Sequence, residues 1–187
     1  MTTTLGAPEP VTDVELVVLL DASGTPVGTA PKAEVHTAAT PLHLAFSCHL
    51  LDEAGRMLVT RRALGKRAWP GVWTNACCGH PAPGEAIEHA VRRRVRQELG
   101  VEITEPELAL PDFQYRAVDA SGIVEHERCP VYIARVDGEL HPDPDETVEW
   151  QWVEPERLIA GIRATPWAFS PWLVLQADQL PLFAGAA

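Results

Sequence analysis

Five residues of the types that bind divalent transition metals are scattered along the first two thirds of the chain. Glu125 and Glu127 stand two residues apart in a stretch that predicts a β-strand, so their side chains share one face. Two carboxylates on one face repel each other unless a cation or a shared proton relieves them. Imidazole and carboxylate ligands together suit a divalent transition metal. A lone Glu-x-Glu is usually a solvated face, so a metal site requires a fold that gathers all five: His36, His43, His80, Glu125 and Glu127.

The most unusual stretch of the sequence is residues 69–81, WPGVWTNACCGHP, which places two tryptophans, two cysteines and a histidine among glycines and prolines. Such a composition favours a rigid loop, and rigid loops with reactive side chains are often functional. Gly79 follows Cys78 and leaves the backbone room for close approach by a ligand. The alternative interpretation, a buried aromatic loop with an inert thiol, is equally compatible with the composition.

The cysteines indicate free thiols in a reducing compartment. Cys77 and Cys78 are adjacent, which suits neither a disulfide framework nor a C-x-x-C metal site. We expect Cys48 and Cys129 to be small buried residues. The start of the chain shows no secretory pattern and no apolar run approaches the ~20 residues that span a bilayer, so a cytoplasmic protein without membrane contacts is expected.

The formal net charge of −11 disfavours a nucleic-acid-binding surface but does not exclude a local basic pocket for a small anion. Basic residues gather near the unusual stretch, where they predict phosphate recognition. We interpret Arg61, Arg67 and Arg92 as ordinary surface charges. The other members of this basic group are Lys32, Arg62, Lys66, Arg93 and Arg94.

The predicted elements indicate an α+β fold. Residues 42–51 alternate, with Leu42, Leu44, Phe46, Cys48 and Leu50 on one face and His43, Ala45, Ser47 and His49 on the other. Strands are predicted over 14–20, 27–29, 42–51, 57–62, 113–118, 123–127, 131–136 and 149–153, and helices over 84–100, 155–162 and 170–180. We expect one domain over residues 12–180, with a loose tail over 1–11 and a second tail over 181–187.

The helix over 84–100 carries a recognisable signature. Its apolar residues recur every three or four positions, and Gly100 is a natural stop. The pattern from Gly79 through Glu85 to Glu98 resembles that of the Nudix superfamily, whose helix usually offers several glutamates to magnesium. The resemblance implies a Nudix-like α/β/α sandwich with a mixed sheet. Here Arg94 and Gln97 occupy two of the glutamate positions, so diphosphate hydrolysis looks disabled.

Taken together, the motifs closely resemble the type 1 isopentenyl-diphosphate isomerase family. The most specific of them is Thr-Asn-x-x-Cys-x-His-Pro over residues 74–81, followed downstream by Glu-x-Glu. The resemblance extends from Val14 to Ala177. The matching stretches are 36–38, 42–46, 60–64, 68–75, 78–81, 93–100, 111–113, 115–117, 122–125, 127, 129–130 and 165–172.

The family interconverts isopentenyl and dimethylallyl diphosphate by a 1,3-allylic proton shift, which requires an acid and a base. The resemblance places Cys78 and Glu127 in these two roles. We assign Glu127, with Tyr115, to the protonating side and Cys78 to the deprotonating side. The resemblance also implies that Trp172 faces a carbocation-like intermediate, in a pocket that excludes water.

The resemblance further implies two metal sites and a small-molecule diphosphate as the partner. His36, His43, His80, Glu125 and Glu127 would bind one Mn²⁺ or Zn²⁺. Glu98 and the carbonyl of Cys78 would bind Mg²⁺ together with the substrate. Lys32, Arg62, Lys66 and Arg94 match the diphosphate contacts. We expect a monomer or weak homodimer in the cytoplasm, supplying isoprenoid biosynthesis.

Two other functions are considered. A Nudix pyrophosphohydrolase is disfavoured by Arg94 and Gln97 and leaves Cys78 without a role. A metal-dependent binding module on the same scaffold would not require Cys78, Tyr115 and Glu127 together. Nucleotide products would support the first function, and binding of isopentenyl diphosphate without turnover would support the second.

Overall fold

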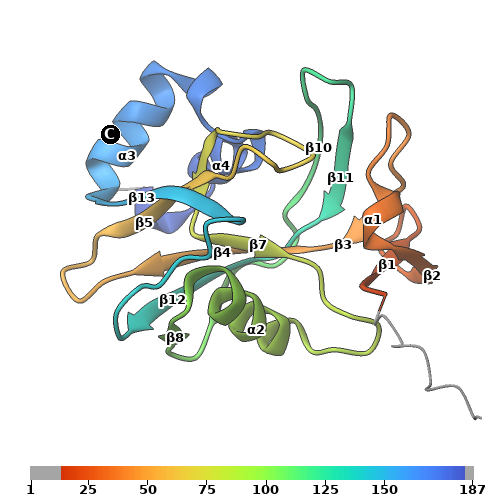
Figure 1. Ribbon diagram of the computed structural model, residues 1–187, viewed down its shortest axis with the longest axis horizontal. Helices are drawn as coiled ribbons and strands as arrows, with labels where there is room; N and C mark the ends of the chain where they lie inside the picture. Colours follow the sequence, from red (N-terminus) through yellow and green to blue (C-terminus); the bar gives the residue numbers. More distant parts are fainter. Residues whose placement is uncertain (1–13, 184–187) are drawn as a thin grey trace, which may run out of the picture.

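A computed structural model describes residues 14–183, which form two β-sheets and the helices that cover them (Figure 1). The five-stranded sheet has the order β10-β11-β3-β1-β2, and the eight-stranded sheet has the order β13-β5-β4-β12-β8 with β6 on β5, β7 on β4 and β9 on β12. The strands β11 and β3 are parallel, as are β12 and β4, whereas the other pairs are antiparallel. The predicted mixed sheet is therefore confirmed.

The strands are β1 Leu16–Leu20, β2 Pro26–Pro31, β3 His43–Leu44, β4 Phe46–Leu51, β5 Met57–Arg62, β6 Trp73–Asn75, β7 Cys77–Gly79, β8 Glu102–Ile103, β9 Glu107–Leu110, β10 Gln114–Val118, β11 Val124–Arg128, β12 Val131–Asp137 and β13 Thr147–Val153. The helices are α1 Lys32–Val35, α2 Ile87–Leu99, α3 Pro155–Ala164 and α4 Pro171–Ala177, with 3-10 turns η1 Pro166–Ala168 and η2 Pro181–Phe183.

Strand β4 lies at the centre of the molecule, and all six of its residues are buried. Phe46, Cys48 and Leu50 face the core beneath α2, whose Val91, Val95 and Leu99 belong to the same cluster. The other face meets the core formed with α3 and α4. The alternation predicted over 42–51 thus separates side chains that face α2 from side chains that face α3 and α4. Helix α2 lies across the sheet from α3 and α4 (Figure 1).

Helix α2 ends as the sequence indicates, since Gly100 adopts φ +62° and its N–H donates to the carbonyl of Arg96. Helix α4 begins with Ser170 as N-cap and Pro171 in its first turn, also as predicted. Its buried face, which includes Trp172 and Gln176, points toward β4 and the space between the sheets. The last two helices therefore position side chains for that space.

The structure corrects several details of the prediction. The stretch 69–81 is not one loop, because it contains strands β6 and β7. Strands β8 and β9 and helix α1 were not predicted. The ordered core continues past the boundary at residue 180, since Phe183 is buried against α3. The proposed tail over 1–11 and the residues after 183 lie outside the described part of the chain.

The four cysteines are free, and Cys48 and Cys129 are buried as predicted. Among residues 14–183, no helix is sufficiently long and apolar to cross a membrane.

Candidate active site

The register of three neighbouring strands places the main polar residues of the site side by side. Tyr115 on β10 lies directly across from Glu127 on β11, and Glu127 in turn lies across from His43 on β3. The Tyr115 hydroxyl donates a hydrogen bond of 2.9 Å to Glu127 Oε2. Because the pairing is fixed by backbone hydrogen bonds, these three side chains share one face of the small sheet.

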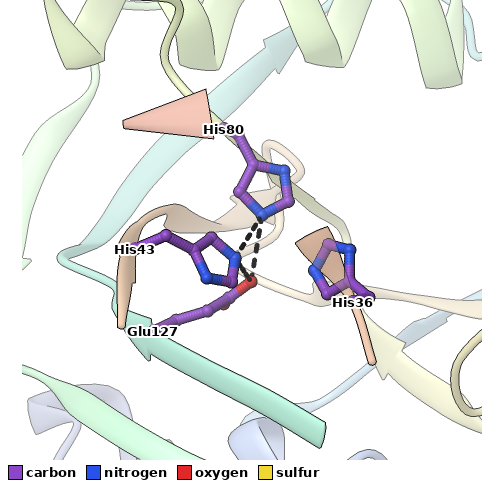
Figure 2. Close-up of side chains that lie close together, drawn as sticks. All are labelled: His36, His43, His80 and Glu127. Carbon is purple, nitrogen blue, oxygen red and sulfur yellow. Dashed lines mark hydrogen bonds and ion pairs between the residues drawn. The ribbon is translucent and has the colours of Figure 1, made fainter. Parts of the chain in front are cut away.

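Three histidines surround the other oxygen of Glu127 (Figure 2). The Nε2 atom of His80 is 3.1 Å from Glu127 Oε1, and that of His43 is 3.5 Å away. One ligand atom from each of His36, His43, His80 and Glu127 lies within 4.8 Å of the others. Zinc binds nitrogen and oxygen at about 2.0–2.2 Å, so its ligand atoms lie up to ~4.4 Å apart. The predicted histidine and glutamate residues therefore converge to nearly the spacing that a metal ion needs.

Three buried polar atoms of the cluster and its edge make no well-formed hydrogen bond within the described chain: Nε2 of His36, Nδ1 of His80 and Oε2 of Glu125. Nε2 of His36 and Oε2 of Glu125 are only 3.0 Å apart, but neither makes a well-formed hydrogen bond. Buried polar atoms without partners are rare in folded proteins, and a bound ion accounts for them. Glu125 contacts His36 but lies outside the four-residue cluster, so it stands at the edge of the candidate site.

Burial and hydrogen-bonded neighbours shift the pKa values of the groups in this cluster in different directions. Burial alone would raise the pKa of Glu127, but hydrogen bonds from His43 and His80 hold it well below the ordinary value. Burial lowers the pKa of His80 to about 4, whereas the contacts of His43 with Glu127 overcome burial and raise its pKa. The pKa of Glu125 is raised, chiefly by burial. Glu127 is thus a carboxylate beside a neutral His80, and both are in metal-binding form.

Cys78 lies on the large sheet and has polar neighbours on two sides. Its Sγ atom is 3.3 Å from the Ser47 hydroxyl and 3.3 Å from the side-chain nitrogen of Asn75. Burial raises the pKa of the Cys78 thiol to about 12, against the opposing effect of these hydrogen bonds. Before substrate binds, Cys78 is therefore a thiol held in a defined position, unlike an unpartnered buried cysteine.

The side chains of Arg94 and Phe46 fill the space beside Gly79. A Cβ atom at this position would lie 2.9 Å from Cγ of Arg94 and 3.0 Å from the ring of Phe46. The glycine therefore allows α2 and Arg94 to pack closely against β7. Gly79 also lines the cavity, and close approach of a ligand to its backbone stays a prediction.

Trp172 is buried and contacts both reactive sides of the site. Its ring centroid is 5.8 Å from that of Tyr115, and its Nε1–H donates to Asn75 Oδ1, next to Cys78. The guanidinium of Arg62 lies 5.4 Å from the indole centroid, and Trp69 packs edge-on against the same ring. The indole is thus fixed by four neighbours, as an aromatic wall of the site requires.

A cavity of about 590 Å³ joins these groups. Its lining includes Cys78 from the large sheet and Tyr115 and Glu127 from the small sheet, with Trp172 from α4. The candidate phosphate ligands also line it: Lys32, Arg62, Lys66 and Arg94. His43 is fully buried behind the lining.

Three of the four candidate phosphate ligands are paired with carboxylates, and a fifth basic residue, Arg67, also lines the cavity although it was interpreted as a surface charge. Lys32 contacts Glu15 at 2.8 Å, while Lys66 and Arg94 both contact Glu146. Arg62 instead donates to the carbonyl oxygens of Ala68 and Trp69. The same cavity is lined by five carboxylates, so it brings the four candidate phosphate ligands together without an excess of positive charge.

Glu98, the glutamate retained from the Nudix signature, is buried at the cavity and forms an ion pair with Arg94. Burial raises the pKa of Glu98, although Arg94 opposes the effect. Gln97 accepts a hydrogen bond from the Arg94 guanidinium at 3.2 Å. The helix therefore presents one carboxylate here, and its other two signature positions form a hydrogen-bonded pair.

Several residues of the site were missed by the sequence analysis. Ser47 and Asn75 flank the Cys78 sulfur, Glu146 links two cavity cations, and Gln176 binds Ser47 from α4. The predicted alternation over 42–51 places Ser47 on the same face as His43, and this pattern could have identified Ser47 as a residue of the site. No sequence pattern pointed to Glu146 or Gln176.

The comparisons with known proteins agree with this architecture. A profile of the NUDIX domain matches residues 41–173. A crystal structure from Deinococcus radiodurans superimposes with a TM-score of 0.69 at 21% identity, covering 89% of this chain and 99% of that one. A MutT NUDIX hydrolase from Burkholderia pseudomallei gives a TM-score of 0.57 at 23% identity, covering 74% of this chain and 97% of that one. At these identities the structures establish the fold only, and the fold defined is that of a Nudix domain.

Sequence relatives narrow the classification. A protein from Agromyces mediolanus named isopentenyl-diphosphate Delta-isomerase is 63% identical over 96% of this chain and 87% of its own length. A protein of the same name from Mycolicibacterium vanbaalenii is 58% identical over 95% of this chain and 96% of its own length. The chain therefore belongs to the isopentenyl-diphosphate Delta-isomerase family within the Nudix superfamily.

Proposed function

We propose that the cavity interconverts isopentenyl diphosphate and dimethylallyl diphosphate, with Cys78 and the Tyr115–Glu127 pair as the two groups that exchange protons with the substrate. The observation that carries the proposal is that a thiol from one sheet and a tyrosine–carboxylate pair from the other line one cavity. A 1,3-allylic proton shift needs this arrangement, because one proton is added to a double bond while another is removed nearby.

On the protonating side, Tyr115 and Glu127 act as a unit. Burial raises the pKa of Tyr115 well above its ordinary value, so the tyrosine keeps its proton. Its hydroxyl donates that proton to Glu127 Oε2 in a 2.9 Å hydrogen bond. When Glu127 is protonated it can supply its proton to the terminal carbon of isopentenyl diphosphate, and the Tyr115 hydroxyl stabilises the carboxylate that remains.

On the other side, Cys78 removes a proton from the carbon next to the cationic centre. Forward turnover begins with a protonated Glu127 and a Cys78 thiolate and ends with a Glu127 carboxylate and a Cys78 thiol. The raised pKa of Cys78 and the lowered pKa of Glu127 favour the thiol and the carboxylate, which is the state at the end of forward turnover. The reverse reaction from dimethylallyl diphosphate begins from this state. One mobile proton must return from Cys78 to Glu127 before the next forward turnover.

Trp172 stabilises the carbocation-like intermediate between the two transfers. An indole face contributes ~2 kcal/mol to a nearby desolvated cation. The aromatic wall formed with Trp69 and Tyr115 also reduces access of water, which would trap the cation as an alcohol.

A divalent metal fits the histidine cluster, as its spacing and its unpartnered atoms indicate. We propose Mn²⁺ or Zn²⁺ bound by His36, His43, His80 and Glu127, with Glu125 at the edge. A cation bound there favours the charged form of Glu127 and holds its carboxylate in place. We also propose that Mg²⁺ binds through Glu98 and the Cys78 carbonyl, in contact with the substrate diphosphate.

The substrate class follows from the same cavity. We propose that the diphosphate is bound by Lys32, Arg62, Lys66 and Arg94 while the five-carbon chain enters toward Trp172. Two divalent cations would offset the negative charge of the diphosphate and of Glu98 and Glu146, which pair with Lys66 and Arg94 when no ligand is bound. The small hydrocarbon tail suits the space between the aromatic rings.

A product assay tests the function. Incubation of isopentenyl diphosphate with the protein, Mg²⁺ and Mn²⁺ is expected to give dimethylallyl diphosphate without release of phosphate. The variants Cys78→Ala and Glu127→Gln are expected to stay folded by circular dichroism and to lose isomerisation. Near-normal turnover by either variant would show that the assigned roles are wrong, and release of phosphate or monophosphate would favour hydrolysis.

A further inference from the structure

A chain of buried polar side chains leads away from the cavity behind Cys78, and the proposed reaction does not account for it. Nε2 of His49 lies 2.9 Å from Oε1 of Gln176, and Nε2 of Gln176 lies 2.9 Å from the hydroxyl of Ser47. The Ser47 hydroxyl contacts the sulfur of Cys78 at 3.3 Å. His49, Gln176 and Ser47 are all 0% exposed. Burying three polar side chains is unfavourable unless each bond is made, so the chain has a defined arrangement.

His49, at the end of this hydrogen-bonded chain farthest from Cys78, determines which group donates and which accepts in each bond. Nδ1 of His49 is buried and has no partner among the described residues. A neutral imidazole carries one proton, and a buried N–H without an acceptor is less favourable than a buried nitrogen lone pair without a donor. The proton therefore resides on Nε2, where Gln176 Oε1 accepts it. Burial lowers the pKa of His49 to about 4, which keeps the ring neutral near pH 7.

The position of the His49 proton determines the orientations of the Gln176 amide and the Ser47 hydroxyl. Since Oε1 of Gln176 faces His49, its NH₂ group faces Ser47 and donates to the hydroxyl oxygen. Ser47 has a single hydroxyl proton, which is then directed to a sulfur atom. Cys78 is nearer at 3.3 Å, and Cys129 lies at 3.5 Å on the buried side.

We propose that His49 and Gln176 are positioning residues that direct the hydroxyl proton of Ser47 to the sulfur of Cys78. This inference rests on the proposed role of Cys78 in proton transfer. The thiol proton of Cys78 has its own acceptor in Asn75 Oδ1 at 3.4 Å, so the Ser47 hydroxyl can donate to the sulfur. The hydroxyl then acts as a donor to the sulfur and holds it in place beside the cavity.

Two substitutions at residue 176 test the direction of the chain. Gln176→Glu keeps the shape but replaces the donor by an acceptor, so the Ser47 proton is drawn away from Cys78. Gln176→Met removes both groups and leaves the hydroxyl free to donate to the sulfur. We expect kcat to fall ~10–100-fold in Gln176→Glu and less than ~5-fold in Gln176→Met, with KM within ~3-fold in both.

The matched controls are Gln179→Glu and Gln179→Met, since Gln179 is exposed just beyond the same helix. Both controls should keep wild-type kcat. If Gln176→Met is as damaging as Gln176→Glu, or if activity simply follows the melting temperature, Gln176 is only structural and the inference is overturned.

A measurement that is independent of activity and of the folding of variants is the ¹⁵N NMR spectrum of the His49 ring in the wild-type protein. A proton on Nε2 near pH 7 supports the inference, and a proton on Nδ1 overturns it. The proposed function fails separately: if Cys78→Ala keeps normal turnover, the role of Cys78 is wrong. If Cys78→Ala is inactive while Ser47→Ala and Gln176→Glu keep kcat within ~3-fold, only the present inference fails.

Discussion

Tyr115 and Glu127 are directly paired across two antiparallel strands, and the hydroxyl of one donates to the carboxylate of the other at 2.9 Å. Neither side chain has to reorganise for this contact, because the strand register fixes it. The same register brings His43 beside Glu127. The Glu127 carboxylate therefore accepts a hydrogen bond from Tyr115 on one side and contacts the histidine cluster on the other.

Replacing Tyr115 by Phe tests the proton donor. The variant keeps the ring that packs on Trp172 but removes the hydroxyl, so we expect kcat to fall ~10–100-fold with little change in KM. Steady-state kinetics with isopentenyl diphosphate measures both parameters. A kcat within twofold of wild type would exclude Tyr115 from the transfer.

Removal of one histidine tests the metal cluster. His36→Ala is expected to lower the amount of Mn²⁺ or Zn²⁺ retained after dialysis, and to reduce the rise in melting temperature when the metal is added back. Elemental analysis and thermal unfolding provide the two readouts. The control is His126→Ala, since His126 lies between the two glutamates but outside the cluster. Equal metal content in both variants would contradict the proposed site.

Neutralising one cavity cation tests the diphosphate contacts. Lys66→Gln removes a charge that lines the cavity and contacts Glu146, so KM for isopentenyl diphosphate is expected to rise ~10-fold while kcat changes less. Arg92→Gln is the comparison, because Arg92 pairs with Glu105 outside the cavity and should leave KM unchanged. Binding of inorganic pyrophosphate, measured by calorimetry, should follow the same order. Unaltered binding in Lys66→Gln would remove this residue from the substrate site.

The pH dependence of stability tests the environment of His49. Its pKa is lowered by burial from 6.5 to about 4, so between these values the unfolded chain binds a proton that the folded chain does not. Stability is therefore lost as the pH falls through this range, by about 2 kcal/mol between pH 7 and pH 5 from this residue alone. His80 acts in the same direction, so the comparison is with His49→Leu. Urea unfolding at both pH values should show a smaller loss for the variant, and an equal loss would contradict the prediction.

Much of the fold was predictable because its main elements are long enough to show periodicity. Helix α2 and its Gly100 stop, and the two faces of β4, appear as the sequence indicated. Strands β6 and β7 were missed because each has only three residues, too few for a pattern. The resemblance to a known family supplied the grouping of the five metal-binding residues, which spacing alone did not establish.

The contacts that the sequence could not reveal join distant segments. Gln176 and Ser47 are 129 residues apart in sequence, and a buried glutamine on a short helix has no local signature. Glu146 likewise reaches Lys66 from a distant turn. Such pairs depend on how the two sheets and α4 pack, and this is determined by the whole core rather than by local propensity.

The most direct test of the central claim is proton NMR of isopentenyl diphosphate with the protein, Mg²⁺ and Mn²⁺ in heavy water. We predict that dimethylallyl diphosphate forms with deuterium in its new methyl group, because Tyr115 and Glu127 exchange with solvent before they protonate the terminal carbon. The same sample with Cys78→Ala should show no product. An unchanged spectrum for the wild-type protein, or the appearance of free phosphate in place of the isomer, would contradict the account.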